Sequence, residues 1–156
     1  MTTIGIDPGL SGGIAYVSDS GAEAIPMPIL DKRPDMEKVA QFLEGLDIGL
    51  VVIEKVQLRP GESGTSALTI GRNVGIIIGW LMAKVIPYEE VPAQTWKKAV
   101  GATCDSKAKP KEKKAASVAA ARRLFPQVEL VLPRCKNYHD GMAEALLIAE
   151  YGRRKR

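Results

Sequence analysis

The segment 2–17 reads TTIGIDPGLSGGIAYV, and it decides the fold. The largely apolar residues Thr3–Ile6 predict a short strand that ends at Asp7-Pro8-Gly9. Ser11-Gly12-Gly13 predicts a turn, and Ile14–Val17 predicts a second strand. The chain therefore opens with a hairpin whose first strand ends in a carboxylate.

The next elements extend this hairpin. Ala22–Met27 predicts a third strand, which makes an antiparallel meander. Apolar residues at helical spacing predict a helix over Asp35–Leu46. The continuous apolar run Leu50–Ile53 is typical of a central strand covered on both faces, and it ends in Glu54.

Strand and helix patterns alternate in the rest of the chain. They predict a helix over Ser66–Val85, a strand over Glu89–Pro92, and helices over Lys111–Leu124 and Asp140–Tyr151. A meander combined with strand–helix–strand crossovers indicates an α/β fold with a mixed sheet and helices on its faces. We expect a single domain over residues 1–156.

Composition narrows the class of protein. The apolar stretch Val74–Ile86 contains Lys84 and is too short to span a bilayer, and the N-terminus lacks a secretory signal pattern. Cys104 and Cys135 have neither metal-ligand spacing nor the pattern of a disulfide framework. We expect a cytoplasmic protein without a membrane partner.

Positive charge is concentrated in two places, although the net charge is only +4. Residues 97–123 hold nine basic and two acidic side chains, and we expect a flexible basic loop at 101–112 and a basic tail at 152–156. Such polarisation suits a phosphate-rich partner. The alternative is a solvated loop and a frayed tail.

Three glycines, Gly71, Gly75 and Gly79, recur every four residues along one predicted helix. Each glycine destabilises the helix by about 1 kcal/mol relative to alanine. A helix face made of three glycines therefore indicates that another segment packs very closely against it. That neighbour is either a second copy of the chain or the protein's own sheet.

Four carboxylates occupy the positions where chemistry is expected. Asp7 and Glu54 end the first and central strands, and Asp140 and Glu144 share one face at the start of the last helix. Taken singly, such acids are usually turn residues or serve the helix dipole. If they converge, their repulsion calls for a cation, and acids without histidine suit Mg²⁺ or Mn²⁺.

A site of this kind suits phosphodiester hydrolysis by two metal ions, which needs no protein nucleophile. None is evident, because Ser11, Cys104 and His139 lack base partners at a recognisable spacing.

Five segments together resemble RuvC-type Holliday junction resolvases, particularly phage-encoded members. The segments are Ile4–Gly9, Val51–Val56, Ser63–Gly75, Val91–Lys97 and His139–Ala149. The resemblance implies a ribonuclease H-like fold with a five-stranded mixed sheet. It also implies a homodimer that makes paired symmetric nicks in four-way DNA junctions, in the host cytosol if the chain is phage-encoded.

The resemblance carries the catalytic, metal-binding carboxylates onto Asp7, Glu54, Asp140 and Glu144, with two Mg²⁺ ions for which Mn²⁺ substitutes. The family pattern has two aspartates three apart on the last helix, whereas here the spacing is four and the second acid is glutamate. Which of these two acids binds metal directly stays open.

The family also uses a lysine before the penultimate helix, and Lys113 is the best match; alternatively it only solvates a helix N-terminus. The residues expected to contact DNA are Arg59, Arg72, Lys97, Lys98, Lys107, Lys109, Lys111 and Lys114.

Two other functions remain open at this point. One is a nucleotide-binding domain of the actin and hexokinase ATPase type, although 156 residues supply only one of the two lobes required. The other is a branched-DNA-binding protein without catalytic activity.

Overall fold

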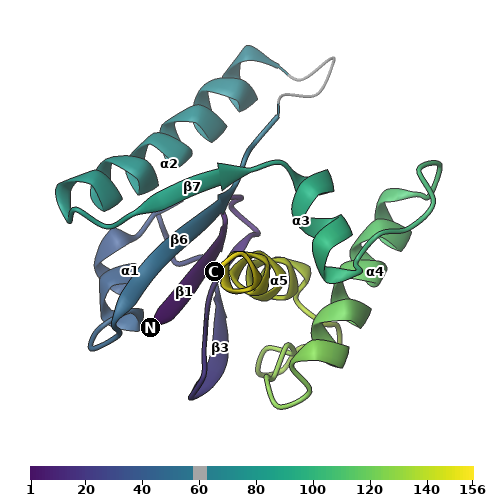
Figure 1. Cartoon of the computed structure of the whole chain (residues 1–156). Helices are drawn as coiled ribbons and strands as arrows, with labels where there is room; N and C mark the ends of the chain where they lie inside the picture. The colour runs from purple at the N-terminus through teal and green to yellow at the C-terminus, as the bar shows by residue number, and fades with distance from the viewer. Residues whose placement is uncertain (58–62) are drawn as a thin grey trace.

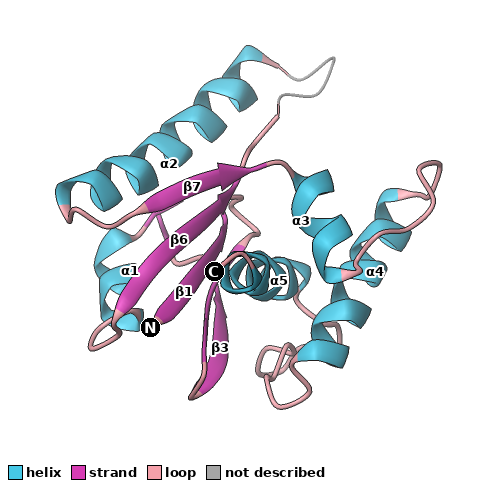
Figure 2. Cartoon of the chain, viewed as in Figure 1, coloured by secondary structure: helices cyan, strands magenta, loops and turns pink. Residues whose placement is uncertain are grey.

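The computed structural model describes residues 1–57 and 63–156, so the expected DNA contact at Arg59 lies outside the described residues. One five-stranded sheet organises the chain (Figures 1 and 2). Its strands lie in the order β3-β2-β1-β6-β7. They are β1 (Thr2–Asp7), β2 (Gly13–Ser18), β3 (Gly21–Pro26), β6 (Ile48–Glu54) and β7 (Tyr88–Val91).

The pairing of the strands confirms the expected mixed sheet. The strand β2 pairs antiparallel with β1 and β3, whereas β6 runs parallel to β1 and β7. In the parallel pair, Ile6 is the partner of Ile53. Asp7 and Glu54, the next residue on each strand, therefore end neighbouring strands at the same edge of the sheet.

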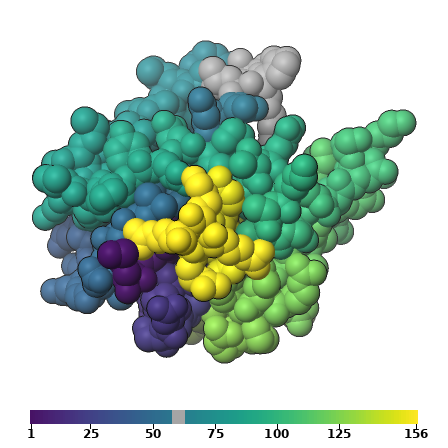
Figure 3. Space-filling view, in the orientation of Figure 1, coloured from purple at the N-terminus to yellow at the C-terminus, as the bar shows by residue number. Residues whose placement is uncertain are grey.

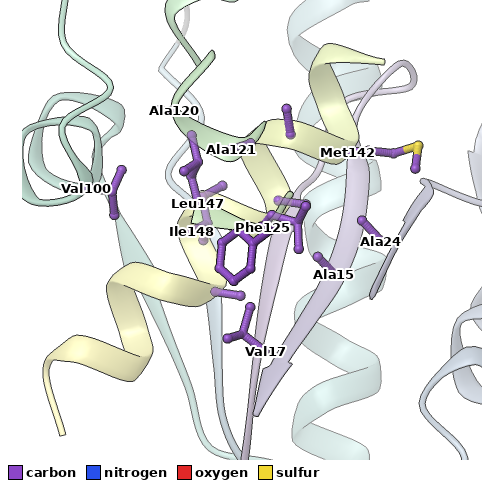
Figure 4. Packing of buried hydrophobic residues seen from close by; sticks show 14 of the residues in the cluster. Ala15, Val17, Ala24, Val100, Ala120, Ala121, Phe125, Met142, Leu147 and Ile148 are labelled. Carbon is purple, nitrogen blue, oxygen red and sulfur yellow. The ribbon is translucent and has the colours of Figure 1, made fainter. Parts of the chain in front are cut away.

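Helices cover both faces of the sheet, as expected. The helices α1 (Met36–Phe42) and α2 (Gly64–Ala83) lie on one face; α3 (Ala93–Val100), α4 (Pro110–Leu124) and α5 (Asp140–Arg154) lie on the other (Figure 1). Alternating residues of β1 and β6 feed two separate apolar clusters. Figure 4 shows part of the α5-side cluster, including Val17, Phe125 and Leu147.

The helix α5 lies unusually close to the sheet. A Cβ atom added at Gly5 of β1 would overlap the backbone of α5 at Ala145. One added at Gly141 would overlap the backbone of the turn before β2. Glycine at these two positions lets the first turns of α5, with Asp140 and Glu144, cross directly over the end of β1.

The helix α2 is attached to the other face much more loosely. Ile77 and Leu81 are buried against the sheet, whereas Leu68 and Met82 are 74% and 64% exposed. Among the described residues, α2 is the one helix long and apolar enough to cross a membrane by length and composition alone. Its most apolar window has a mean hydropathy of 1.3 and is 17% buried.

Several elements differ from the sequence-based expectation. The helix α3 was not expected; it lies between Pro92, its N-cap, and Gly101, whose left-handed backbone ends it. A small hairpin of β4 (Ile29–Leu30) and β5 (Arg33–Pro34) was also not expected. The helix α4 begins at Pro110, so residues 110–112 of the expected loop are helical.

The C-terminal residues are tied to the body rather than extended. The helix α5 continues to Arg154, so the basic tail expected at 152–156 is mostly helical. Lys155 pairs with Glu89 of β7, with 2.7 Å between Nζ and Oε2. Figure 3 shows the last residues, in yellow, on the surface beside the purple N-terminal residues.

Candidate metal-binding site

The four acids predicted from the sequence converge at one edge of the sheet. Asp7 and Glu54 end adjacent strands, and α5 brings Glu144 and Asp140 to them. The pKa of Asp7 is raised to about 7, first by burial and then by the charges of Glu54, Glu144 and Asp140. The backbone N–H of Gly9 donates to Asp7 Oδ1 at 3.2 Å and partly opposes this shift.

Glu54 experiences the same crowding of negative charge. Burial raises its pKa, and the neighbouring charge of Glu144 raises it further. The indole of Trp96 and the ammonium of Lys97 act in the opposite direction. Repulsion among converging acids is the electrostatic condition under which a bound cation stabilises a site.

Neutral and positive donors hold the glutamates. Trp96 donates its indole N–H to Glu54 Oε2 at 2.9 Å. Glu144 Oε1 accepts from Lys97 Nζ at 2.7 Å and from Ser117 Oγ at 2.9 Å. The helices α3 and α4 thus supply donors to acids on β6 and α5.

Asp140 is paired with Lys114, and this contact raises the pKa of the lysine. Lys113, the lysine favoured by the sequence, instead donates to the carbonyl oxygen of Ser106 at 3.2 Å. A catalytic role for Lys113 stays a prediction; the ammonium groups that contact the acids belong to Lys97 and Lys114.

The spacing of the acids differs from the expectation that all four carboxylates surround the metal ions together. Within residues 1–57 and 63–156, no three acidic, histidine or cysteine side chains are grouped closely enough to hold a metal ion together. The lysine ammonium groups contact the oxygens of Glu144 and Asp140 in this conformation. The donor set itself, carboxylate oxygens with strong mutual repulsion, fits a hard divalent cation.

A groove of about 570 Å³ adjoins Asp7 and Glu54. Its opposite wall is the N-terminal half of α2, where Thr65, Thr69 and Asn73 continue the helix face that is apolar farther along. The Oδ1 atom of Asn73 is buried and has no hydrogen-bond partner within the described part of the chain. A polar helix face turned toward acids and open space suits a polar substrate strand.

A second cavity, of about 640 Å³, lies at the other end of α5. The charged groups there already neutralise one another, because Glu150 pairs with Arg153 and Arg154 at 2.7 Å each. This cavity therefore offers no comparable concentration of unbalanced charge.

The basic residues expected to contact DNA fall into two groups. Lys97 and Lys114 contact the acids, as described above. The others within the described residues have exposed side chains: Arg72 on α2, Lys98 on α3, Lys107 and Lys109 in the loop, and Lys111 on α4. Their roles in DNA binding stay predictions.

Sequence reasoning did not identify Trp96 or Ser117. Both are completely buried, and each donates to an acid at least 27 positions away along the chain. A buried tryptophan needs a hydrogen-bond acceptor for its N–H, so the sequence predicts that Trp96 has an acceptor but not which residue it is.

No protein-family model matches the sequence, and no curated protein matches it. Two solved structures are similar to the chain over 99% of its length and 96% of theirs. One is Thermus thermophilus RuvC in complex with a Holliday junction substrate, with 18% identity and a TM-score of 0.67. The other is a Thermus thermophilus RuvC structure, with 16% identity and a TM-score of 0.58. At these identities the likeness concerns the fold, and the chain has the ribonuclease H-like fold of RuvC.

Proposed function

We propose that this protein is a divalent-metal-dependent endonuclease that cuts four-way DNA junctions. The observation that carries the proposal is the convergence of Asp7 with Glu54, Glu144 and Asp140 at one edge of a ribonuclease H-like sheet. The similar RuvC structure contains a Holliday junction substrate, which supports this choice of substrate.

The carboxylates of Asp7, Glu54, Glu144 and Asp140 would hold the cation, and Mg²⁺ is the proposed ion, with Mn²⁺ as a substitute. Such an ion supplies Lewis-acid activation of water and neutralises charge on phosphate oxygens. We propose two ions per site, as in other nucleases with clustered acids.

The lysines of the site contribute a second source of positive charge. Lys97 and Lys114 contact Glu144 and Asp140, two of the acids that a scissile phosphate would approach. An ammonium group placed there stabilises the negative charge that builds on the phosphate during hydrolysis. These residues are therefore proposed to bind and neutralise the scissile phosphate.

The substrate strand is proposed to enter the groove between Asp7 and α2. Thr65 and Thr69 offer hydroxyl groups there, and Asn73 lines the same groove. The exposed lysines from Lys98 to Lys111 extend the positive surface for flanking phosphates.

We also propose that the protein acts as a homodimer joined through α2. Leu68, the three glycines and Met82 share one exposed face of this helix. A Cβ atom at Gly71, Gly75 or Gly79 would meet no other described residue within 4 Å, so the stripe does not pack on its own sheet. A two-fold axis on this face would match the two-fold symmetry of a junction.

The test is cleavage of a synthetic four-way junction by the wild-type protein and by Glu54→Gln, each with Mg²⁺ and with chelator. We expect paired nicks only from the wild type with Mg²⁺, and junction binding by both proteins. Binding without cutting under every divalent-ion condition would favour a non-catalytic junction-binding protein. Nucleotide binding without junction binding would favour the ATPase alternative.

A further inference from the structure

We propose that Trp96 and Ser117 are positioning residues, which brace Glu54 and Glu144 for monodentate binding of a divalent cation. Each donor engages one oxygen of its glutamate: Oε2 of Glu54 and Oε1 of Glu144. Among the hydrogen bonds of the described residues, the second oxygen of each acid is not engaged. This inference rests on the proposed metal-dependent function.

The two donors are well suited to hold a carboxylate still. Trp96 and Ser117 are both 0% exposed, and they lie on α3 and α4, which pack into the same apolar cluster as α5. An indole N–H can only donate, so its burial requires an acceptor, and Glu54 is that acceptor. Packing of α3 and α4 holds the two donor side chains in place, and their hydrogen bonds then hold the carboxylates of Glu54 and Glu144.

The hydroxyl of Ser117 has a choice of acceptors. It is 3.4 Å from the carbonyl oxygen of Lys113, the usual partner one helical turn back, and 2.9 Å from Glu144 Oε1. The shorter contact is the one with the acid, and charge-assisted hydrogen bonds are the stronger kind. Ser117 therefore links α4 to Glu144 and not only to its own helix.

The glutamates need such support more than the aspartates do. A glutamate has one more rotatable bond than an aspartate, so a free Glu54 or Glu144 loses more side-chain entropy when a cation fixes it. Asp7 is shorter and already accepts the N–H of Gly9 at 3.2 Å. Three of the four acids thus have one oxygen held by a neutral donor, an arrangement that lowers the cost of binding a cation.

The test compares Mg²⁺ affinity in three variants by calorimetry: Trp96→Phe, Ser117→Ala and, as control, Trp80→Phe. Loss of a group that orients a metal ligand typically reduces metal affinity by about 10- to 100-fold. We expect such a loss for Trp96→Phe and Ser117→Ala. The control removes the other tryptophan, which lies on α2, and should leave the affinity unchanged.

The control variant provides a second readout, because Trp96 is then the only tryptophan. We expect its fluorescence to change saturably with Mg²⁺, as Glu54 redistributes charge toward the ion. If the wild type neither binds Mg²⁺ nor cuts junctions, both proposals fail. If it does both, while Ser117→Ala and a folded Trp96→Phe bind Mg²⁺ as tightly as the wild type, only the positioning role is overturned. Should Trp96→Phe not fold, unchanged affinity in Ser117→Ala together with an unresponsive Trp96 overturns it.

Discussion

The two faces of the sheet differ sharply in how their helices are attached. On one face, α5 is buried along nearly its whole length and touches β1 through glycine. On the other, α2 buries only 17% of its apolar window and leaves a glycine stripe open. The close contact places the acids at the end of β1, and the loose one leaves exposed the surface that we propose for a substrate strand and a second protomer.

The largest expected effect is on junction cutting, and it tests the acids that lie where α5 crosses the end of β1. Asp7→Asn should reduce junction cutting by at least about 10²- to 10³-fold, because it removes a group on which transition-state charge stabilisation depends. Junction binding should persist or strengthen, since repulsion near the phosphate falls. The measurement is single-turnover cleavage with an electrophoretic binding assay. Thr69→Val, on the α2 wall of the groove, is the control and should lose far less.

The second effect concerns folding and compares one glycine on each side. Gly5→Ala forces a methyl group against the backbone of α5, and such overpacking costs about 1–3 kcal/mol or more. Gly75→Ala fills open space and improves helix propensity by about 1 kcal/mol, so it should not destabilise the protomer. Urea denaturation measures both, and equal losses would mean that the two helices are attached alike.

The third effect concerns assembly. Gly75→Leu places a large side chain on the open stripe, where a Cβ atom meets none of the described residues within 4 Å. We expect this variant to be folded by circular dichroism and to sediment as a monomer, and we expect the wild type to sediment as a dimer. Its two nicks in a junction should become uncoupled. If Gly75→Leu still sediments as a dimer, the interface lies elsewhere.

The smallest effect is a pH dependence of stability without metal. Folding raises the pKa of Asp7 from 3.8 to about 7, and that of Glu54 moves in the same direction. The folded state therefore keeps protons that the unfolded state releases, and stability should fall as pH rises from about 4 to about 7. Thermal melts with chelator measure this fall. Mg²⁺ at pH 8 should restore stability, and Asp7→Asn should flatten the profile. A flat wild-type profile would mean that burial and the neighbouring charges do not raise the pKa of Asp7.

Much of the fold could be predicted from local patterns. The hairpin, the central strand and the helices on both faces follow from apolar periodicity and turn residues, and the structure confirms them. The helix α3 is not among the predicted elements, because Lys97 and Lys98 stand out in the sequence only as the start of the basic segment 97–123. Pro92 and Gly101, a start and a stop with eight residues between them, were the available signal.

The sequence by itself determined that Asp7 and Glu54 each end an apolar strand, because the apolar runs fix where the two strands stop. The parallel pairing of β1 with β6, which brings the two acids to one edge of the sheet, belongs to the tertiary structure. Only the tertiary structure decided which lysines contact the acids and that Trp96 and Ser117 brace them. Adjacent helix residues such as Lys113 and Lys114 point about 100° apart, as 3.6 residues per turn requires. Which of them faces the site depends on how α4 packs against α5, a choice made by long-range packing rather than by local sequence.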